Sequence, residues 1–346
     1  MYEEPRGVWI MAYTTIDDPE AYFQTVVYTG NGSADHAITL DGDTDMQPDL
    51  VWIKNRDAID SPCLFDAVRG ATKILTTDSE DAEATDADTL DSFTSDGFQV
   101  DADVKVNTNT EKYVAWCWKE SAASGLDILT YTGNATARTQ AHSLSAKPNF
   151  ILVKKTSASS GSWFVYLTGG VPATHYIKLN ETGAIGEGNL WNDVEPTSSV
   201  FSLGTSSDVN GDGITYVAYV FSSIQGYSKF GSYEGNGNAD GTFVYLGFKP
   251  AWLMIKEVDA TSGWCQWDNK RPLQVQGFYN PNQNFLQVNE TGVESNNANL
   301  AVDFLGNGFK VRNAAGDINT SGSTMIFMAF AEAPLVNSEG VPCNAR

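Results

Sequence analysis

One motif occurs three times along this chain of 346 residues, and its even spacing limits the folds that the chain can adopt. The motif is Tyr-x-Gly-Asn, and its copies begin at Tyr28, Tyr131 and Tyr233, about one hundred residues apart. A proline-led apolar run that ends in lysine follows each copy. These runs are Pro48–Lys54, Pro148–Lys154 and Pro250–Lys256. Because both features keep the same offset in all three places, the sequence predicts three tandem copies of one structural unit.

Further segments follow in the same order in each copy. The segments "PCLFD", "SWFVY" and "WCQWD" end at Asp66, Tyr166 and Asp268, and we align these three residues with one another. Each copy then closes on an apolar run, which is "YVAWCW", "YVAYVF" or "MIFMAF". The first copy departs most in its middle, where the acid-rich "DSEDAEATDADTLD" replaces the "NETG" of the other two.

These segments have the composition of β-strands, since they are short, rich in branched and aromatic residues, and bounded by Gly, Asn, Asp and Pro. In "YVAWCW", the two-residue period places Val114, Trp116 and Trp118 on one face and the smaller Ala115 and Cys117 on the other. The run is almost continuously apolar. We therefore expect burial on both faces, against the core of its own unit and against a second layer or a neighbouring unit.

The predicted fold is all-β, with three antiparallel β-sandwich units of jelly-roll or lectin-like type and about seven strands in each. The best helical candidate is Asp17–Gln24, which we expect to form one short turn or an arm. Linkers rich in Ser, Gly and Ala are expected near 121–125 and 222–228. The predicted divisions are an amino-terminal arm at 1–25, units at 26–120, 126–222 and 229–334, and a tail at 335–346.

The charge balance disfavours several classes of partner. With 21 Lys and Arg against 43 Asp and Glu, the formal net charge is −22, so we expect no nucleic-acid binding. An acidic surface suits a protein that must stay soluble. No apolar stretch reaches the roughly eighteen residues that a membrane helix needs, and the start of the chain does not resemble a signal peptide. We predict no membrane insertion, and Met11 is a possible true start.

Residues typical of catalysis are scattered. The cysteines form no Cys-x-x-Cys pair and the histidines no His-x-x-x-His pair, so neither a zinc site nor a nucleophilic triad is predicted. Sandwich glucanases often carry a Glu-x-Asp-x-x-Glu strand, which this sequence lacks. We expect no enzyme activity, no catalytic residues, and thiols that are structural or incidental. The residues in question are Cys63, Cys117, Cys265, Cys343, His36, His142 and His175.

One segment resembles the first half of a calcium loop. Asp208, Asn210 and Asp212 supply oxygen atoms at positions one, three and five, and glycine follows at position six. Position twelve is Tyr219, where such loops need a bidentate glutamate. A hairpin turn before the closing strand and a calcium site both remain open. No other cofactor is predicted.

Two further features are candidates for ligand contact. Trp163, Trp191, Trp264 and Trp267 lie near turn-rich stretches, so we expect them to be more exposed than the other tryptophans and able to stack on sugar rings. The acidic residues between 78 and 91 form either a cation-collecting loop or a solvated one.

Two parts of the chain are similar to a known group of sequences. They are the first unit, with "PDLVWIKNR" and "DSFTSDGFQVDADVKVNTNTEKYVAWCWK", and the ending "DFLGNGFKVRNAAGDINTSGSTMIFMAFAEAP". They resemble a repeat family of uncharacterised virion proteins from marine and cyanobacterial tailed bacteriophages, often labelled tail fibre. The resemblance covers nearly the whole chain from Met11 and is looser in the second unit. It implies a lectin-like sandwich and carries over no catalytic residue.

The same resemblance implies a virion protein, assembled in the host cytoplasm, that acts as a tail-fibre or receptor-binding component. Its implied partners are other virion proteins, host-surface polysaccharide and further copies of the chain, with a trimer plausible. A capsid-decoration or connector protein remains open, and a glycan-degrading enzyme ranks third. We expect specificity to lie in the stretches that vary between the units, at 78–91, 183–194 and 277–284.

Overall fold

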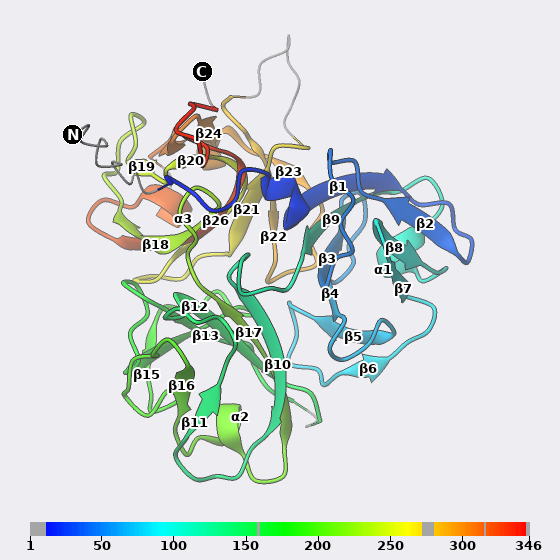
Figure 1. Ribbon diagram of the computed structural model, residues 1–346, viewed down its shortest axis with the longest axis vertical. Coiled ribbons are helices and arrows are strands. Elements are labelled where there is room, and N and C mark those ends of the chain that lie inside the picture. Colours follow the sequence, from blue (N-terminus) through cyan, green and yellow to red (C-terminus); the bar gives the residue numbers. More distant parts are fainter. Residues whose placement is uncertain (1–11, 158–159, 272–279, 315, 344–346) are drawn as a thin grey trace, which may run out of the picture.

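The computed structural model describes residues 12–157, 160–271, 280–314 and 316–343. Strands hold 42% of the residues and helices 6%, which confirms the all-β prediction. The possible start at Met11 lies outside the described residues. Three large antiparallel sheets occupy successive parts of the chain and surround a common centre (Figure 1).

The first large sheet belongs to residues 23–118, called unit 1 below. Its strand order is β1-β9-β3-β4-β5-β6, and a small sheet of order β2-β8-β7 accompanies it. The large sheet comprises β1 (Phe23–Thr29), β9 (Lys112–Trp118), β3 (Leu50–Asn55), β4 (Cys63–Asp66), β5 (Lys73–Thr76) and β6 (Ala84–Thr85). The small sheet comprises β2 (His36–Thr39), β8 (Gly97–Val100) and β7 (Leu90–Thr94).

Residues 126–221, called unit 2, repeat this strand order. The large sheet comprises β10 (Leu126–Thr132), β17 (Thr215–Phe221), β12 (Phe150–Lys155), β13 (Phe164–Leu167), β14 (His175–Lys178) and β15 (Gly186–Glu187). The small sheet pairs β11 (Arg138–Ala141) with β16 (Val200–Leu203).

Residues 228–334, called unit 3, repeat it again. The large sheet comprises β18 (Ser228–Glu234), β26 (Thr324–Pro334), β20 (Phe248–Glu257), β21 (Cys265–Asp268), β22 (Asn284–Gln287) and β23 (Ser295–Asn296). The small sheet comprises β19 (Phe243–Tyr245), β25 (Gly308–Val311) and β24 (Val302–Leu305). In all three units the first and last strands pair with each other, so each unit closes on itself.

Each large sheet packs one face against its own small sheet. In unit 1, Val51, Phe65 and Cys117 share a buried cluster with Ile38 and Phe98 of the small sheet. Equivalent clusters fill units 2 and 3. This two-layer packing gives the molecule a β-sandwich-like character, and it uses the face of β9 that carries the smaller side chains.

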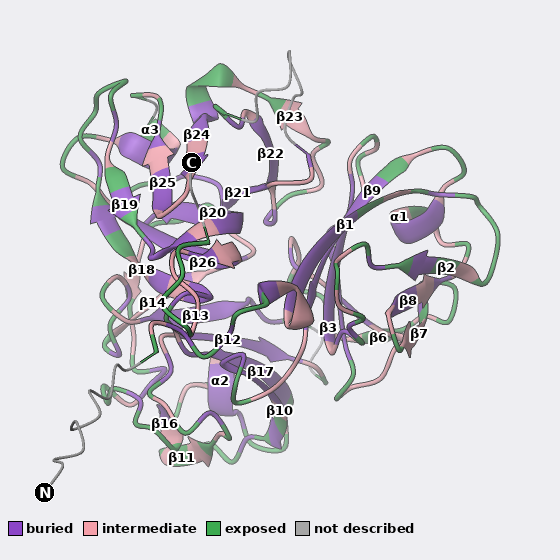
Figure 2. Cartoon of the chain, turned by 45° about the horizontal axis from the view of Figure 1, so that its top comes forward, coloured by how far each residue is buried: buried purple, intermediate pink, exposed green. Residues whose placement is uncertain are grey.

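The opposite faces of the three large sheets meet in one central core. Trp52 and Trp118 of unit 1, Phe221 of unit 2, and Met254 and Phe330 of unit 3 belong to a single cluster. The predicted burial of β9 on both faces, with its large side chains on one of them, is therefore confirmed. Figure 2 shows buried strands facing this centre and exposed loops on the outside. Full burial of one such side chain contributes about 1.5–3 kcal/mol, so the units stabilise one another strongly.

The Tyr-x-Gly-Asn motif anchors a one-turn helix beside each closing strand. In unit 2 this helix is α2 (Ser207–Asn210), and Tyr131 donates a hydrogen bond from its hydroxyl to the Val209 carbonyl at 2.7 Å. Gly133 must be glycine, because a Cβ there would lie 2.2 Å from the Gly211 carbonyl oxygen. The same contacts recur at α1 (Val104–Asn107) and α3 (Gly316–Asn319).

Two short 3-10 turns complete the fold, η1 (Pro19–Ala21) and η2 (Ala298–Leu300). Asp18 caps η1 by accepting a hydrogen bond from the Glu20 backbone at 3.1 Å. The segment predicted from Asp17 is therefore a single turn, after which the chain enters β1.

Candidate functional site

The four tryptophans predicted to be exposed are buried. Trp163 and Trp267 are 0% exposed, and Trp191 and Trp264 are 2% exposed. The expectation of exposure is therefore wrong. Trp191 and Trp267 lie in the buried clusters of their own units, and the segments of Trp163 and Trp264 contact a neighbouring unit. Trp163 of unit 2 donates its indole N–H to the Thr76 carbonyl of unit 1 at 3.0 Å.

The remaining three indoles have comparable partners. Trp264 of unit 3 donates to the Lys178 carbonyl of unit 2 at 3.0 Å. Trp191 and Trp267 donate to carbonyls within their own units, at 3.1 and 3.0 Å. A buried indole with a satisfied N–H is a packing element, and these four present no stacking face to a sugar.

The calcium-like segment Asp208, Asn210 and Asp212 spans α2 and the turn after it. The Asn210 amide oxygen accepts the backbone N–H of Asn134 at 3.1 Å, so it points into the unit. Asp208 lies 3.4 Å from the Lys155 ammonium, and Asp212 is exposed. Asn107 and Asn319 occupy the same place in the other units and make the same bond to their own turns, at 2.8 and 2.9 Å.

The local fold is therefore a one-turn helix in each unit rather than the hairpin turn considered from the sequence. Asn210 locks the Tyr-x-Gly-Asn turn to that helix. No group of three or more His, Cys, Asp or Glu side chains suited to a metal ion occurs among the described residues.

The acidic stretch 78–91 lies partly between units 1 and 2. The Glu80 carboxylate accepts a hydrogen bond from the Ser162 hydroxyl at 2.7 Å, and its carbonyl accepts one from the Lys154 ammonium at 3.0 Å. Burial raises the pKa of Asp78, which accepts a hydrogen bond from the Ser61 hydroxyl. This stretch is therefore part of a unit boundary as well as a loop.

Clusters of buried charged side chains lie at two of the boundaries between units. At the 1–2 junction, Asp66 is the last residue of β4 and Arg69 follows the strand. Arg69 contacts the carboxylates of Asp66 at 2.5 Å and Glu83 at 3.1 Å. Tyr219 of unit 2 donates its hydroxyl to Asp66 at 2.7 Å. One carboxylate thus holds an arginine of its own unit and a tyrosine of the next.

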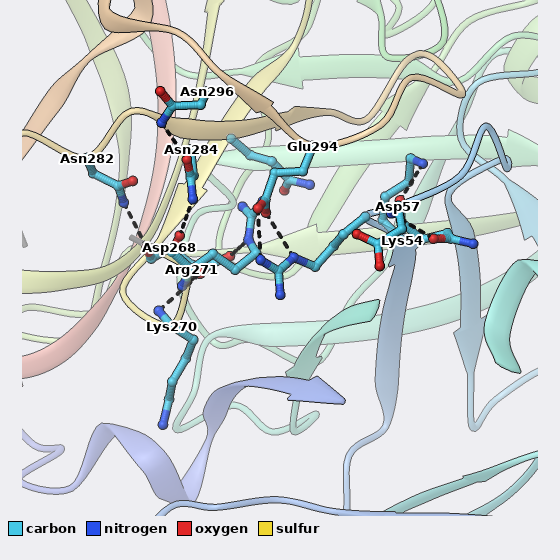
Figure 3. Close-up of polar contacts among 12 residues, drawn as sticks. Lys54, Asp57, Asp268, Lys270, Arg271, Asn282, Asn284, Glu294 and Asn296 are labelled. Atoms are coloured by element: carbon cyan, nitrogen blue, oxygen red, sulfur yellow. Dashed lines mark hydrogen bonds and ion pairs between the residues drawn. The ribbon is translucent and has the colours of Figure 1, made fainter. Parts of the chain in front are cut away.

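The 3–1 junction repeats this arrangement (Figure 3). Arg271 contacts Asp268 at 2.6 Å and Glu294 at 2.8 Å. Trp116 of unit 1 donates its indole N–H to Asp268 at 3.0 Å, and the Arg271 guanidinium lies 5.6 Å from the indole centroid. Arg56 of unit 1 adds a second ion pair to Glu294 at 2.8 Å.

The 2–3 junction has the same geometry without an Asp-Arg-Glu cluster. The strand register places Leu167 where the other units have Asp66 and Asp268, because Leu167 pairs with the first residue of β12 as Asp66 does with that of β3. The sequence alignment that matched Tyr166 to the aspartates is therefore wrong by one residue. Gly170 stands at the arginine position and packs against Ile326 of unit 3.

Ile185 stands at the glutamate position of the 2–3 junction. Its backbone N–H donates to the Val258 carbonyl of unit 3, just as that of Glu83 donates to Thr156 and that of Glu294 to Arg56. Asp, Arg and Glu at two junctions are thus replaced together by Leu, Gly and Ile at the third. The facing residue changes with them, from Tyr219 or Trp116 to Met328 at the same place in β26.

The electrostatics fit a structural role for these clusters. Burial acts to lower the pKa of Arg271, but the carboxylates of Asp268 and Glu294 outweigh it, so that pKa is raised. Burial acts to raise the pKa of Glu294, but Arg56 and Arg271 hold that pKa below its ordinary value. Asp268 and the Arg271 side chain are fully buried. The charged forms of Arg271 and Glu294 are therefore favoured by their partners, and the buried Asp268–Arg271 pair is closed off from solvent.

A buried lysine crosses each of the three junctions. Lys54 donates to the Thr291 carbonyl of unit 3 at 3.1 Å, and Lys256 donates to the Thr182 carbonyl of unit 2 at 3.2 Å. Lys154 makes the equivalent bond to Glu80 of unit 1. Burial lowers the pKa of each of these lysines to about 8. They are the lysines that end the three proline-led runs.

An apolar cavity lies at the centre, where the three large sheets meet. All of the side chains that line it belong to the central core, and none of them carries a charge. No polar surface faces the cavity. The lining residues are Leu50, Trp52, Leu64, Trp118, Phe150, Leu152, Leu179, Tyr219, Phe221, Met254 and Met328. This cavity is a packing gap and lacks the polar groups that would orient a substrate.

Sequence reasoning missed the junction residues Arg69, Glu83, Arg271 and Glu294. A signal was present, because Asp-x-x-Arg begins at the last residue of β4 and of β21 and is absent at the end of β13. Of the stretch 277–284, residues 277–279 lie outside the described residues, and Asn282 and Asn284 are buried. Figure 3 shows these two amides beside the Asp268 cluster.

The fold and its junctions define an all-β protein in which three sheets share one central core. Over residues 18–334 the chain matches the model of a family described as a domain of unknown function (DUF7483). The match covers most of the chain, and this protein belongs to that family. A search of curated proteins and a search of solved structures each gave no match. None of the helices among the described residues is long and apolar enough to cross a membrane.

Proposed function

We propose that this protein is a bacteriophage virion component, most simply a tail-fibre or receptor-binding protein that contacts host-surface glycans. The observation that carries the proposal is that the buried charged groups at the three junctions are occupied in holding the units together. A chain organised in this way is a rigid scaffold for its outer loops. Scaffold-borne loops are a common way to build a binding surface.

We also propose that each unit is a lectin-like or jelly-roll sandwich. Support comes from the repeated packing of a large sheet on a small one, and from the resemblance to virion proteins described above. The net charge of −22 further supports a protein that stays soluble at high local density.

The test is adsorption of the purified, fluorescently labelled chain to cells of marine cyanobacteria, with and without prior removal of their surface polysaccharide. The proposal expects binding that falls when the polysaccharide is stripped. Binding to phage particles but to no cells would instead support the alternative, a capsid-decoration or connector protein. Release of soluble sugar from the cells would support the third candidate, a glycan-degrading enzyme. Sedimentation of the same sample tests the proposed homo-oligomer.

A further inference from the structure

The outer face of the small sheet in unit 3 differs from its counterparts in the other units. Phe243 and Tyr245 of β19 are 43% and 48% exposed, and they are the only exposed aromatic side chains among the described residues. They flank the buried Val244, so both point to the same outer face. Alternate residues of a strand lie about 6.6 Å apart.

The equivalent positions in units 1 and 2 show that the fold does not require aromatic residues there. Val244 pairs with Phe309 in the same register in which Ile38 pairs with Phe98. Phe243 and Tyr245 therefore correspond to Ala37 and Thr39 of unit 1. In unit 2, Gln140 pairs with Phe201 in the same register, so the corresponding residues there are Thr139 and Ala141. All four of these are small and exposed.

Groups that can form hydrogen bonds surround the two rings. Lys310 lies opposite Phe243 and is paired with Asp240 at 2.5 Å, and Asp303 lies opposite Lys310 on the next strand. On the other side, Lys229 lies 5.5 Å from the centroid of the Tyr245 ring.

The Tyr245 ring is also held in place. Its hydroxyl lies 3.2 Å from that of Tyr13, and Tyr13 donates to the Gly247 carbonyl at 2.8 Å. Lys229 donates to the Tyr245 carbonyl at 2.6 Å. An ordered ring loses little conformational entropy when a ligand binds.

We infer that the outer face of β19, β25 and β24 binds a glycan, with sugar rings stacked on Phe243 and Tyr245. This inference rests on the proposed function and names the residues that would carry it. A pyranose ring has an apolar face, which an aromatic ring covers, and a rim of hydroxyl groups, which ion-paired lysine and aspartate side chains can bond. The four buried tryptophans offer a sugar neither of these two interactions.

The charge of the face favours a glycan over a second copy of this chain. Lys229, Lys310 and Arg312 stand against Asp240 and Asp303, which leaves one cation in excess locally. A neutral or an acidic sugar can therefore approach. A second copy of the chain would bring the same local excess of positive charge to a symmetric contact, which opposes pairing of this face with itself.

The test uses the double variant Phe243→Ala with Tyr245→Thr, which gives unit 3 the residues of unit 1 at this face. The full chain is applied to an array of defined neutral and acidic bacterial-surface oligosaccharides. We expect the wild type to bind at least one, and the double variant to bind it on the order of tenfold more weakly, because two stacking contacts are lost. Thr39→Ala in unit 1 and Thr139→Ala in unit 2 are matched controls and should bind as the wild type does.

The outcomes separate this inference from the proposed function. Equal glycan binding by wild type and double variant overturns the inference and leaves the proposed function standing. Wild-type adsorption to cells with no binding to any oligosaccharide, or with adsorption unchanged in the double variant, also overturns the inference alone. No adsorption to any cells counts against the proposed function itself. A wild type that sediments as a dimer, with a monomeric double variant, would assign the face to a second copy.

Discussion

The 2–3 junction and the 3–1 junction occupy equivalent places between neighbouring sheets, yet their chemistry is opposite. The 3–1 junction buries Asp268, Arg271 and Glu294 against Trp116. The 2–3 junction fills the same positions with Leu167, Gly170 and Ile185. One backbone arrangement therefore accepts either a buried ion-pair cluster or plain apolar packing.

The difference shows that the junction residues change as a set. An aspartate at the first position would bury an unpaired charge if it faced Met328, since methionine offers no N–H or O–H donor. The aspartate accepts a hydrogen bond where it faces the Tyr219 hydroxyl or the Trp116 indole N–H. The chemistry of each boundary thus matches one neighbour, and this matching disfavours packing of the units in a wrong order.

The largest expected effect is that of Arg271→Leu. Removal of this guanidinium leaves the buried carboxyl group of Asp268 without its ion-pair partner, and breaking a buried ion pair costs about 3–5 kcal/mol. The free energy of unfolding, measured by urea denaturation, should fall by that amount.

The matched control converts the 3–1 junction to the 2–3 type with Asp268→Leu, Arg271→Gly, Glu294→Ile and Trp116→Met. Replacing a whole buried cluster by apolar residues often leaves stability unchanged or higher. The quadruple variant should therefore be more stable than Arg271→Leu alone. If it is less stable, the two junction types are not interchangeable.

A smaller loss is expected from Gly170→Ala at the 2–3 junction. A Cβ at Gly170 would lie 2.2 Å from Cγ2 of the buried Ile326, so the units must move apart or Ile326 must shift. Overpacking of this kind costs about 1–3 kcal/mol, measurable by the same denaturation. Gly183→Ala is the control, because nothing lies within 4 Å of a Cβ there. Equal stability of the two variants would mean that the 2–3 junction is loosely packed.

Much of the framework could be predicted from the sequence, because its cause is local. The two-residue period of "YVAWCW" gave the correct faces for Trp116 and Ala115. The recurring Tyr-x-Gly-Asn turn marks a contact with a helix later in the same unit, 76 residues on in units 1 and 2 and 83 in unit 3. The glycine is required by that close approach.

The site residues were harder to predict, because their environment comes from another unit. Nothing near Trp163 in the sequence indicates that Thr76 of unit 1 will accept its N–H. Tyr166 was aligned with the aspartates by its position after an aromatic segment, whereas the strand register selects Leu167. Partners that lie in different units leave no local pattern.

A buried lysine lies at each of the three junctions, whereas the ion-pair clusters lie at only two of them. Burial lowers the pKa of Lys256 from 10.5 to about 8, so between these values the unfolded chain holds a proton that the folded chain has released. Unfolding free energy should therefore rise with pH in this window, by up to about 1 kcal/mol per pH unit for each lysine. Below pH 8 the folded state bears the cost of the buried charge.

The buried thiols of Cys63, Cys117 and Cys265 oppose this trend at higher pH. Burial raises their pKa, so unfolding is favoured once the free thiols ionise above about pH 8.5. The contribution of each lysine is therefore best measured by urea denaturation between pH 8 and 10.5, as the difference between the lysine variant and the wild type, because the thiols contribute equally to both. Lys54→Met, Lys154→Met and Lys256→Met should each reduce the slope by a similar amount. A slope that changes in only one variant would show that the junctions differ in their lysines too.

The smallest expected effect is that of Arg56→Ala, which removes a contact found at the 3–1 junction alone. The position corresponds to Thr156 at the 1–2 junction and Val258 at the 2–3 junction, where no ion pair forms. The Arg56 and Glu294 side chains are 17% and 15% exposed, and Glu294 keeps its bond to Arg271. We therefore expect a loss of only about 0.5–1 kcal/mol, which shrinks further in high salt. Lys249→Ala, which breaks an exposed pair with Glu332 inside unit 3, should cost no more. A salt-independent loss as large as that of Arg271→Leu would place Arg56 within the buried cluster and make the two polar junctions different in kind.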